Sequence, residues 1–267
     1  RVRIGTFLLL LPLHNAVRVA EDAATVDILS NGRFDMGLGQ GYARSEFEGY
    51  GIPRNERGSR MEEGVQVIKG IWTEDPFSYQ GKHYNLKGIS LEPKPAQSPH
   101  PPLWIGANAP KAVERAARLG CHFLGGGASE TQESYDAALL KHGRDPNDYY
   151  AAQLRWTYVA ETHDQAWEDC QEHLHYMLSW YGRWLSEAKD FSGAEQFLQL
   201  PSPSELRKNP EALLGNPMVG TPDEIGAEIQ KFVGEVRTTH IVMGMHLPGI
   251  APEKSRRSME LFAKEVM

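Results

Sequence analysis

The segment from residue 29 to residue 41, LSNGRFDMGLGQG, constrains the fold of this chain more than any other segment. Asn31 and Gly32 form a turn signal at the end of a helical pattern. After this turn, apolar residues alternate with Asp35 and with glycines, which is the period of a β-strand. The strand leads into a glycine-rich loop. In chains that alternate strands and helices, a ligand commonly binds at such a loop.

The alternation of strand and helix continues along the rest of the chain. Amphipathic helices are predicted between the strands, including one over residues 57–72. A (β/α)8 barrel needs eight strands, so two strands upstream of Arg1 would complete it. A doubly wound open sheet needs no further strands and is the rival architecture. Six apolar runs have the length and continuity of buried parallel strands, at residues 2–10, 33–38, 103–107, 121–124, 154–160 and 239–243.

Three segments add detail to this pattern. Residues 77–84 predict a β-hairpin around Gln80 and Gly81. The segment from Thr221 to Glu224 has the pattern of a helix-capping box. Residues 186–214 show no clear period, and we expect an excursion or lid there, within a single domain that spans residues 1–267.

Composition narrows the class of protein. The formal net charge of -7 argues against nucleic acid or an anionic membrane as the main partner. No apolar run approaches the ~18 residues of a membrane span. Cys121 and Cys170 lack a metal-ligand spacing, which predicts buried thiols in a reducing compartment and hence a cytoplasmic location. Since the chain starts at Arg1 within a strand pattern, we expect its natural N-terminus to lie upstream.

Two features near the first glycines are candidates for ligand binding. The glycines at positions 37, 39 and 41 lack the spacing of a dinucleotide-binding fingerprint, so they indicate either a ligand loop or a tightly packed strand end. Arg60 lies in the first turns of the helix predicted over residues 57–72, where its guanidinium could bind a phosphate in bidentate fashion. A solvated arginine on a helix face is the alternative.

Two later strand ends are candidates as well. Residues 106–110, GANAP, lead from a strand into a helix N-terminus, where free N–H groups favour an anion and Asn108 adds a donor. A plain strand-to-helix turn is the alternative. Gly125, Gly126 and Gly127 follow the next strand, and they suit either the close approach of a flat ring or phosphate, or a flexible link.

His14 follows the first predicted strand, on the side where the active face of a barrel would lie, and is the candidate catalytic residue. The histidines and acidic residues show no metal-binding pattern, so we expect no metal. The chain has no Gly-x-Ser-x-Gly motif, which argues against an α/β hydrolase.

Taken in order, these segments resemble the bacterial luciferase-like flavin-dependent monooxygenases. The resemblance covers nearly the whole chain except residues 186–214, and the order and spacing of the motifs are more specific than any single one. Arg60, Glu63 and Trp72 keep the expected places. The matching segments are LPLHNAVRVAED at 11–22, DILSNGRF at 27–34, GLGQG at 37–41, PLWIGA at 102–107, VGTPDE at 219–224 and LFAKEV at 261–266.

The resemblance implies a TIM-type (β/α)8 barrel that binds a flavin at the C-terminal ends of its strands, with the first two strands absent from this chain. It implies a cis peptide between Phe7 and Leu8 beneath the flavin ring, and an Arg60 that contacts the flavin phosphate. Gln40 would lie near that phosphate, where true luciferases carry an arginine. The cofactor-binding residues that the resemblance implies are Phe7, Leu8, Gln40, Tyr42, Arg60, Ala107, Asn108, Ala109, Gly125 and Gly126.

In function, the resemblance implies a flavin-dependent monooxygenase that oxidises a small organic substrate with reduced FMN and O2. A flavin reductase would supply the reduced flavin, and a homodimer is expected. The histidine often assigned to catalysis in the family lies upstream of Arg1, and His14 is its nearest substitute. An F420-dependent oxidoreductase on the same fold, which would transfer hydride, is one alternative, and a non-catalytic flavin-binding subunit is another. The glutamine at position 40 weakens the case for a luciferase proper.

Overall fold

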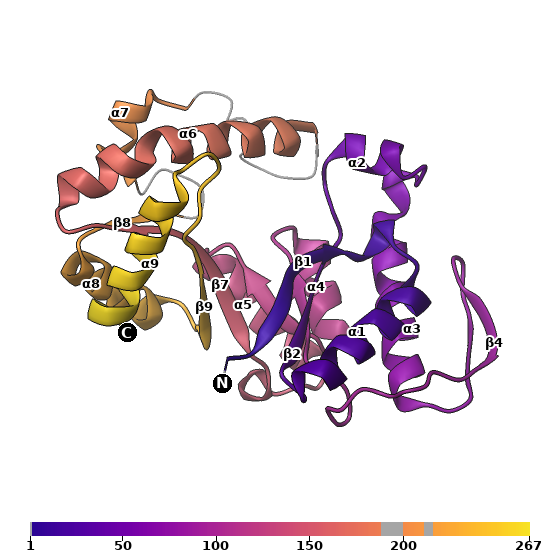
Figure 1. Cartoon of the computed structure of the whole chain (residues 1–267). Coiled ribbons are helices and arrows are strands. Elements are labelled where there is room, and N and C mark those ends of the chain that lie inside the picture. The colour runs from indigo at the N-terminus through magenta and orange to yellow at the C-terminus, as the bar shows by residue number, and fades with distance from the viewer. Residues whose placement is uncertain (1, 188–199, 211–215) are drawn as a thin grey trace. The chain divides into compact units, whose positions relative to one another are not determined.

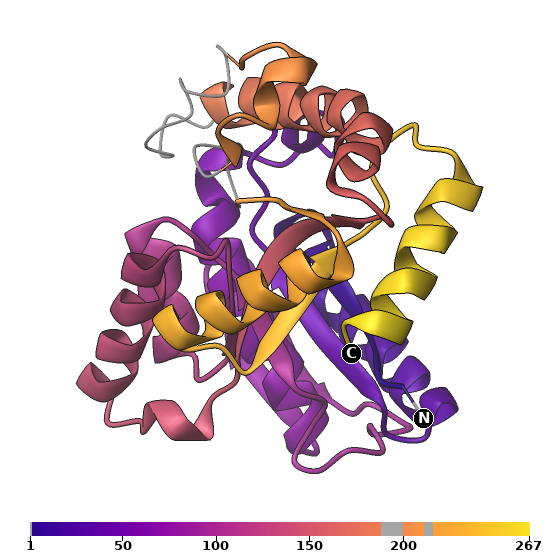
Figure 2. The same ribbon diagram turned by 90° about the vertical axis from the view of Figure 1, so that its left-hand side faces the viewer.

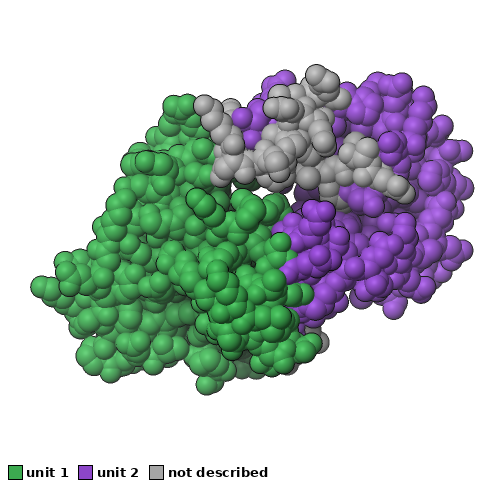
Figure 3. Space-filling model, turned by 180° about the vertical axis from the view of Figure 1, so that it is seen from behind, with its two compact units in different colours: residues 1–124, 134–149 green, residues 125–133, 150–267 purple. Residues whose placement is uncertain are grey.

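The computed structural model describes residues 2–187, 200–210 and 216–267. Strands and helices alternate along the chain, as Figure 1 shows. The chain divides into two compact units, which Figure 3 distinguishes by colour. Unit 1 comprises residues 1–124 and 134–149, and unit 2 comprises residues 125–133 and 150–267.

The sheet of unit 1 is parallel, and its strands pair in the order β1-β2-β5-β6. Near the C-terminal ends of these strands, Leu10 pairs with Gly39 and Leu38 pairs with Ile105. The register of β1 against β2 shifts between Thr6 and Leu9. The strands are β1 (Ile4–Leu10), β2 (Phe34–Gly39), β5 (Leu103–Gly106) and β6 (His122–Gly125), of which Gly125 belongs to unit 2.

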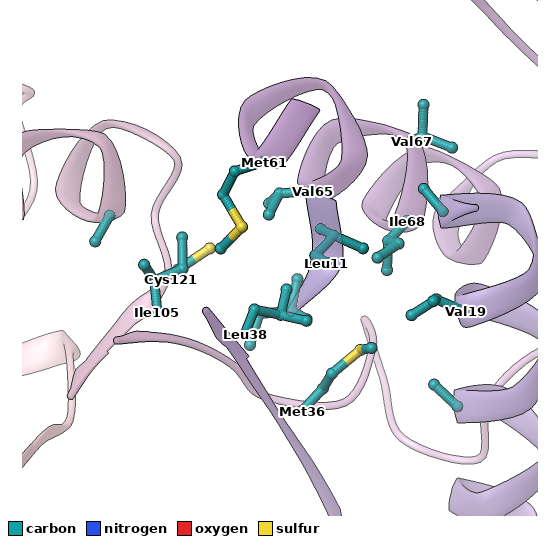
Figure 4. Packing of buried hydrophobic residues seen from close by; sticks show 14 of the residues in the cluster. Leu11, Val19, Met36, Leu38, Met61, Val65, Val67, Ile68, Ile105 and Cys121 are labelled. Carbon is teal, nitrogen blue, oxygen red and sulfur yellow. The ribbon is translucent and has the colours of Figure 1, made fainter. Parts of the chain in front are cut away.

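The helices of unit 1 cover this sheet with an apolar layer. Figure 4 shows Met61 and Val65 of α3 facing Met36 and Leu38 of β2 in the buried cluster. The helical elements are α1 (Ala16–Ser30), α2 (Arg44–Gly49), α3 (Arg57–Thr73), α4 (Pro110–Arg118), α5 (Ser129–Lys141), whose first residues belong to unit 2, and the short 3-10 turns η1 (Leu11–Leu13), η2 (Arg54–Glu56) and η3 (Pro146–Asp148).

An antiparallel hairpin, β3 (Phe77–Gln80) and β4 (Asn85–Ile89), lies along α3. The aromatic ring of Phe77 occupies the space that a side chain at Gly70 of α3 would need. One turn earlier on the helix, Gln66 accepts a hydrogen bond from the hydroxyl of Tyr79. The β3 strand of the hairpin is therefore packed along one side of α3.

Unit 2 has its own parallel strands, with β7 (Ala151–Val159) pairing with both β8 (Met218–Gly220) and β9 (His240–Gly244). Side chains of α6 (His163–Glu187) and α7 (Pro203–Leu206) form one buried cluster. Side chains of α8 (Pro222–Glu235) and α9 (Pro252–Glu265) pack against β7, β8 and β9 in another. Figure 2 shows α8 and α9 from the side.

The predicted elements are largely confirmed. All six predicted strands are present, although the fifth begins at Ala151 rather than at residue 154. The hairpin and the capping box at Thr221 are also present. The prediction missed the short helices α2 and α7 and the three-residue strand β8. These elements are too short for an apolar period to be visible.

Several sequence predictions concern parts that the structure does not decide. Of the excursion or lid expected at residues 186–214, positions 188–199 and 211–214 lie outside the described residues; α7 falls within the described part. The single domain over residues 1–267 and the two upstream strands stay predictions. None of the described helices is both long enough and apolar enough to cross a membrane.

Candidate functional site

Two surface hollows in unit 1 lie at the C-terminal end of β1. Hollow A has a volume of about 500 Å³ and is lined by residues 6–10, Leu13, His14, Glu46 and Tyr50. Hollow B has a volume of about 400 Å³ and is lined by residues 13–15, Ile52, Arg60 and residues 83–86 of the hairpin. Leu13 and His14 line both, so the two hollows adjoin.

The peptide bond between Phe7 and Leu8 in hollow A is cis, as the resemblance implied. A β-carbon at Gly106 would overlap the side chain of Leu8, and β-carbons at Gly37 and Gly39 would lie in close contact with it. The glycines therefore leave room for a bulky group, as the sequence suggested. In the structure this group is the side chain of Leu8 of the same chain and not a ligand.

His14 is exposed at the junction of the two hollows. Its imidazole makes an edge contact with the ring of Tyr50, with 6.1 Å between ring centroids. The next residue, Asn15, caps α1 by accepting hydrogen bonds from the N–H groups of Val17 and Arg18. The cap fixes the backbone beside His14, and the imidazole is placed where a ligand of either hollow would pass.

Arg60 lies near the start of α3 and lines hollow B. Its guanidinium is therefore accessible, which the predicted contact with a phosphate requires. Its Nε donates to Glu56 Oε2 at 3.1 Å, and its Nη2 lies 3.0 Å from the same oxygen. The other oxygen of Glu56 accepts a hydrogen bond from Lys82 Nζ at 3.1 Å. The Lys82 hydrogen bond, together with that from Arg60, lowers the pKa of Glu56.

The turn of the hairpin is fixed to α3 by Glu63. Its Oε1 accepts the backbone N–H of Lys82 at 2.9 Å, and its Oε2 accepts those of His83 at 2.8 Å and Tyr84 at 3.3 Å. The imidazole Nε2 of His83 also lies 2.8 Å from Ser59 Oγ. These contacts hold residues 83–86 in place as one wall of hollow B.

Gln40 and Tyr42 do not line hollow A or hollow B. Gln40 Oε1 accepts a hydrogen bond from Arg115 Nη1 of α4 at 3.0 Å. Burial lowers the pKa of the Arg115 guanidinium, and the charge of Glu62 opposes this effect. The carbonyl of Tyr42 accepts from Arg54 Nε at 3.0 Å. The presence of an arginine of α4 beside Gln40 was not predicted from the sequence.

Ala107, Asn108 and Ala109 form the connection from β5 to α4. The N–H of Ala107 donates to the carbonyl of Leu124, which continues the sheet pattern. The carbonyl of Ala109 accepts from two N–H groups in the first turn of α4. Asn108 is exposed, and none of the three residues lines either hollow. Their phosphate-binding role stays a prediction.

Gly125 and Gly126 belong to unit 2, where the glycine loop is held by β7. Arg155 Nη1 donates to the Gly126 carbonyl at 3.2 Å, and Gln153 Oε1 accepts the Gly127 N–H at 2.9 Å. Arg155 is only 4% exposed, and burial lowers the pKa of its guanidinium. Gly127 has a φ of +93°, and a β-carbon there would overlap Arg155. No residue was predicted from the sequence for this contact, although Arg155 stands out as the lone charged residue in the apolar run 154–160.

The sequence of this chain matches a known protein family. The family model described as luciferase-like monooxygenase matches residues 1–239. The chain belongs to the luciferase-like monooxygenase family. The oxidoreductase class that the sequence resemblance implied is therefore confirmed.

Relatives of this luciferase-like chain include named oxygenases. It is 27% identical to the oxygenase component of a flavin-dependent trigonelline monooxygenase from Acinetobacter baylyi, over 100% of this chain and 76% of that protein. It is 35% identical to an FMNH2-dependent dimethylsulfone monooxygenase from Pseudomonas putida, over 41% of this chain and 31% of that protein. The second match thus spans about a third of the relative's length.

Solved structures show the same fold. A monooxygenase from Streptomyces bottropensis matches with a TM-score of 0.83 and 24% identity, over 100% of this chain and 78% of that one. An F420-dependent secondary alcohol dehydrogenase matches with a TM-score of 0.77 and 23% identity, over 100% and 79%. These likenesses confirm the predicted α/β fold class of luciferase-like, TIM-barrel type.

Proposed function

We propose that this luciferase-like chain is the oxygenase of a system that uses reduced FMN and O2 to oxidise a small organic substrate. The named activities of the trigonelline and dimethylsulfone relatives support the reaction class. The name "oxygenase component" in the first relative supports a separate flavin reductase as the donor of reduced flavin. The homodimer and the cytoplasmic location stay predictions.

The observation that carries this proposal is that an apolar hollow adjoins a hollow lined by an arginine side chain. Hollow A is lined mainly by the apolar segment from Phe7 to Leu10, and hollow B contains the Arg60 guanidinium. FMN has the same division, because a flat ring system is joined to a charged phosphate by a flexible chain. Apolar walls with a few placed polar groups are typical of cofactor sites. The residues present therefore fit the cofactor.

Each residue would have a defined part in binding. Phe7 and Leu8 would provide the surface for the ring, and Arg60 would bind the phosphate with charge-assisted hydrogen bonds. Tyr50 and Leu13 would limit the access of water to the ring. His14, at the junction, is the candidate for holding a proton near the substrate. Reduced flavin, when bound, would supply the electrons that activate oxygen.

Titration of the purified protein with FMN tests the proposal. We expect Arg60→Met to weaken FMN binding about tenfold or more, as loss of a charge-assisted hydrogen bond predicts. Riboflavin, which lacks the phosphate, should bind both proteins equally. Arg18→Met is the control, since Arg18 also pairs with an acidic residue four positions away on a helix but lies outside both hollows. Equal FMN affinity of wild type and Arg60→Met would refute the site.

The fold likeness to an F420-dependent alcohol dehydrogenase favours hydride transfer as a second candidate function. The two functions differ in their use of oxygen. Reconstitution with reduced FMN or reduced F420, followed by measurement of O2 consumption with candidate substrates, distinguishes them. Formation of an oxygenated product with reduced FMN and O2 supports the monooxygenase, whereas retention of F420 with substrate oxidation and no oxygen uptake supports the dehydrogenase. Tight flavin binding without turnover would instead support a non-catalytic subunit.

A further inference from the structure

Arg60 is held by a carboxylate of its own helix, which creates an electrostatic problem for anion binding. Glu56 Oε2 lies about as close to Arg60 Nη2 as to its Nε, at 3.0 and 3.1 Å. This contact orients the guanidinium. Its negative charge also opposes the attraction that Arg60 exerts on an approaching anion, since both act over the same short distance.

Lys82 lies on the other side of the same carboxylate. Its Nζ donates to Glu56 Oε1 at 3.1 Å, so Glu56 lies between two cations. The carboxyl group is ionised at neutral pH, and these partners lower its pKa further below its ordinary value, with the Lys82 hydrogen bond as the largest cause. Arg60, Glu56 and Lys82 together carry one net positive charge, whereas Arg60 and Glu56 alone carry none.

The position of Lys82 depends on the fixed hairpin turn. Glu63 binds the backbone N–H of Lys82, and His83 is tied to Ser59 by its imidazole. Because the backbone is held at two points of α3, the lysine side chain starts from a defined place beside Glu56. The hairpin is therefore more than a wall of hollow B: it brings a cation to the carboxylate that orients Arg60.

We propose that Lys82 is a positioning residue for the anion site of hollow B: it neutralises Glu56, so that Arg60 is both oriented and effectively cationic toward a ligand phosphate. This inference rests on the proposed function, in which Arg60 binds the phosphate of FMN. It assigns a role to the segment Gly81–Tyr84 that the family assignment alone does not give. The ligand group it concerns is a phosphate monoester.

The test compares FMN with riboflavin in wild type and Lys82→Met at low and high salt. We expect Lys82→Met to weaken FMN binding about three- to tenfold at about 0.02 M salt, and less at about 0.5 M, because salt screens exposed charges. Riboflavin binding should not change. Lys82→Arg, which keeps the charge, should restore FMN affinity to nearly that of wild type.

Lys87→Met is the matched control, because Lys87 is an exposed lysine on β4 of the same hairpin. It should leave FMN binding unchanged. Equal FMN affinity in wild type and Lys82→Met would overturn the inference. So would equal losses for FMN and riboflavin, which indicate a structural effect, or an equal loss in Lys87→Met, which indicates net charge alone.

A failure of the proposed function would give a different result from a failure of the inference on Lys82. If Arg60→Met leaves FMN binding unchanged, the phosphate is not at hollow B and both proposals are wrong. If Arg60→Met weakens FMN binding and Lys82→Met does not, only the inference on Lys82 is wrong.

Discussion

Leu8 and the glycines around it show how single residues shape the floor of the candidate site. A β-carbon at Gly37 would overlap the carbonyl oxygen of Thr6, whereas one at Gly106 would overlap the end of the Leu8 side chain. A side-chain end can turn away, but a strand carbonyl in a paired sheet cannot. The identity of Gly37 is therefore dictated by the backbone of β1, whereas a β-carbon at Gly106 would require the end of the Leu8 side chain to move.

We expect Gly37→Ala to lower the free energy of unfolding by about 2–3 kcal/mol, as overpacking in a rigid setting does. Gly49→Ala is the control, since a β-carbon at Gly49 has no described neighbour within 4 Å. Because Gly49 lies in α2 and alanine favours a helix over glycine, this substitution should not lower stability. Urea unfolding followed by circular dichroism measures both changes, and equal stability of Gly37→Ala and wild type would contradict the packing argument.

A second residue-level prediction concerns Glu62, which pairs with both terminal nitrogens of Arg118 at 2.9 and 3.0 Å. The Arg118 hydrogen bond lowers the pKa of Glu62 below its ordinary 4.5. A carboxyl group with a lowered pKa stabilises the fold above pH 4.5, and this contribution is lost as pH falls through the folded-state pKa. Glu62→Gln should therefore lower stability at pH 7 by about 1 kcal/mol.

The stability difference between Glu62→Gln and wild type should shrink below pH 4.5, where the wild-type carboxyl group also loses its charge. Thermal unfolding between pH 7 and pH 3 measures it, within the range in which the fold persists. Glu172→Gln, an exposed position on α6, is the control and should show no such pH dependence. A constant difference at all pH values would indicate lost packing instead.

The candidate site was only partly predictable at the scale of residues. Phe7, Leu8, His14 and Arg60 line the two hollows, while their functional roles stay predictions. Periodicity reveals the strand that precedes His14 and the helix that carries Arg60, whereas Phe7 and Leu8, which lie within β1, were named from the resemblance. The hydrogen bond from Arg115 to Gln40 joins residues 75 positions apart. Periodicity shows which face of α4 is buried, but it does not show which distant polar group a buried arginine meets.

At the scale of elements, helix ends carry the clearest sequence signals. Thr221 and Glu224 form the reciprocal pair that the sequence predicted: Glu224 Oε2 accepts the Thr221 N–H at 2.8 Å, and Thr221 Oγ1 accepts the Glu224 N–H at 3.4 Å. Pro222 occupies the first helical position, where no N–H partner is needed. Such signals are local, so they can be recognised without knowledge of the fold.

We expect Thr221→Ala to lower stability by about 1 kcal/mol, because two N–H groups at the start of α8 lose their partners or their geometry. Thr25→Ala is the control, since Thr25 is exposed in α1 and alanine favours the helix. Thermal unfolding monitored by circular dichroism should show a lower midpoint for Thr221→Ala alone. An unchanged midpoint would mean that packing of Ile225 and Phe232 suffices to start the helix.

The docking of the hairpin on α3 could not be predicted, although the hairpin itself was. Local sequence gives the two strands and their turn, but Glu63 meets the turn 19 to 21 positions further along the chain. A glutamate on a helix most often faces solvent, and nothing in its local sequence marks it as the acceptor of three backbone N–H groups. This contact gives hollow B its second wall, so the part that was missed shapes the candidate site.

For the whole molecule, the order of elements was enough to predict the fold class, because alternating apolar strands and amphipathic helices leave few architectures. The choice between a barrel and an open sheet was not contained in that order. It came from motif resemblance and then from the structural likenesses. Substrate choice depends on side chains that vary on a common fold, so it cannot be derived at this scale.

Ligand binding should change the stability of the whole chain in a way that reports on the phosphate. A ligand present at about 100 times its dissociation constant stabilises the folded state by about 2.7 kcal/mol. For a chain of this size we therefore expect FMN to raise the thermal midpoint by about 5–10 °C. Riboflavin at the same concentration should raise it less, because it cannot use Arg60, and F420 should do so only if the second candidate function is correct. Equal shifts with FMN and riboflavin would mean that the ring alone is bound, and hollow B would then have no part in binding the cofactor.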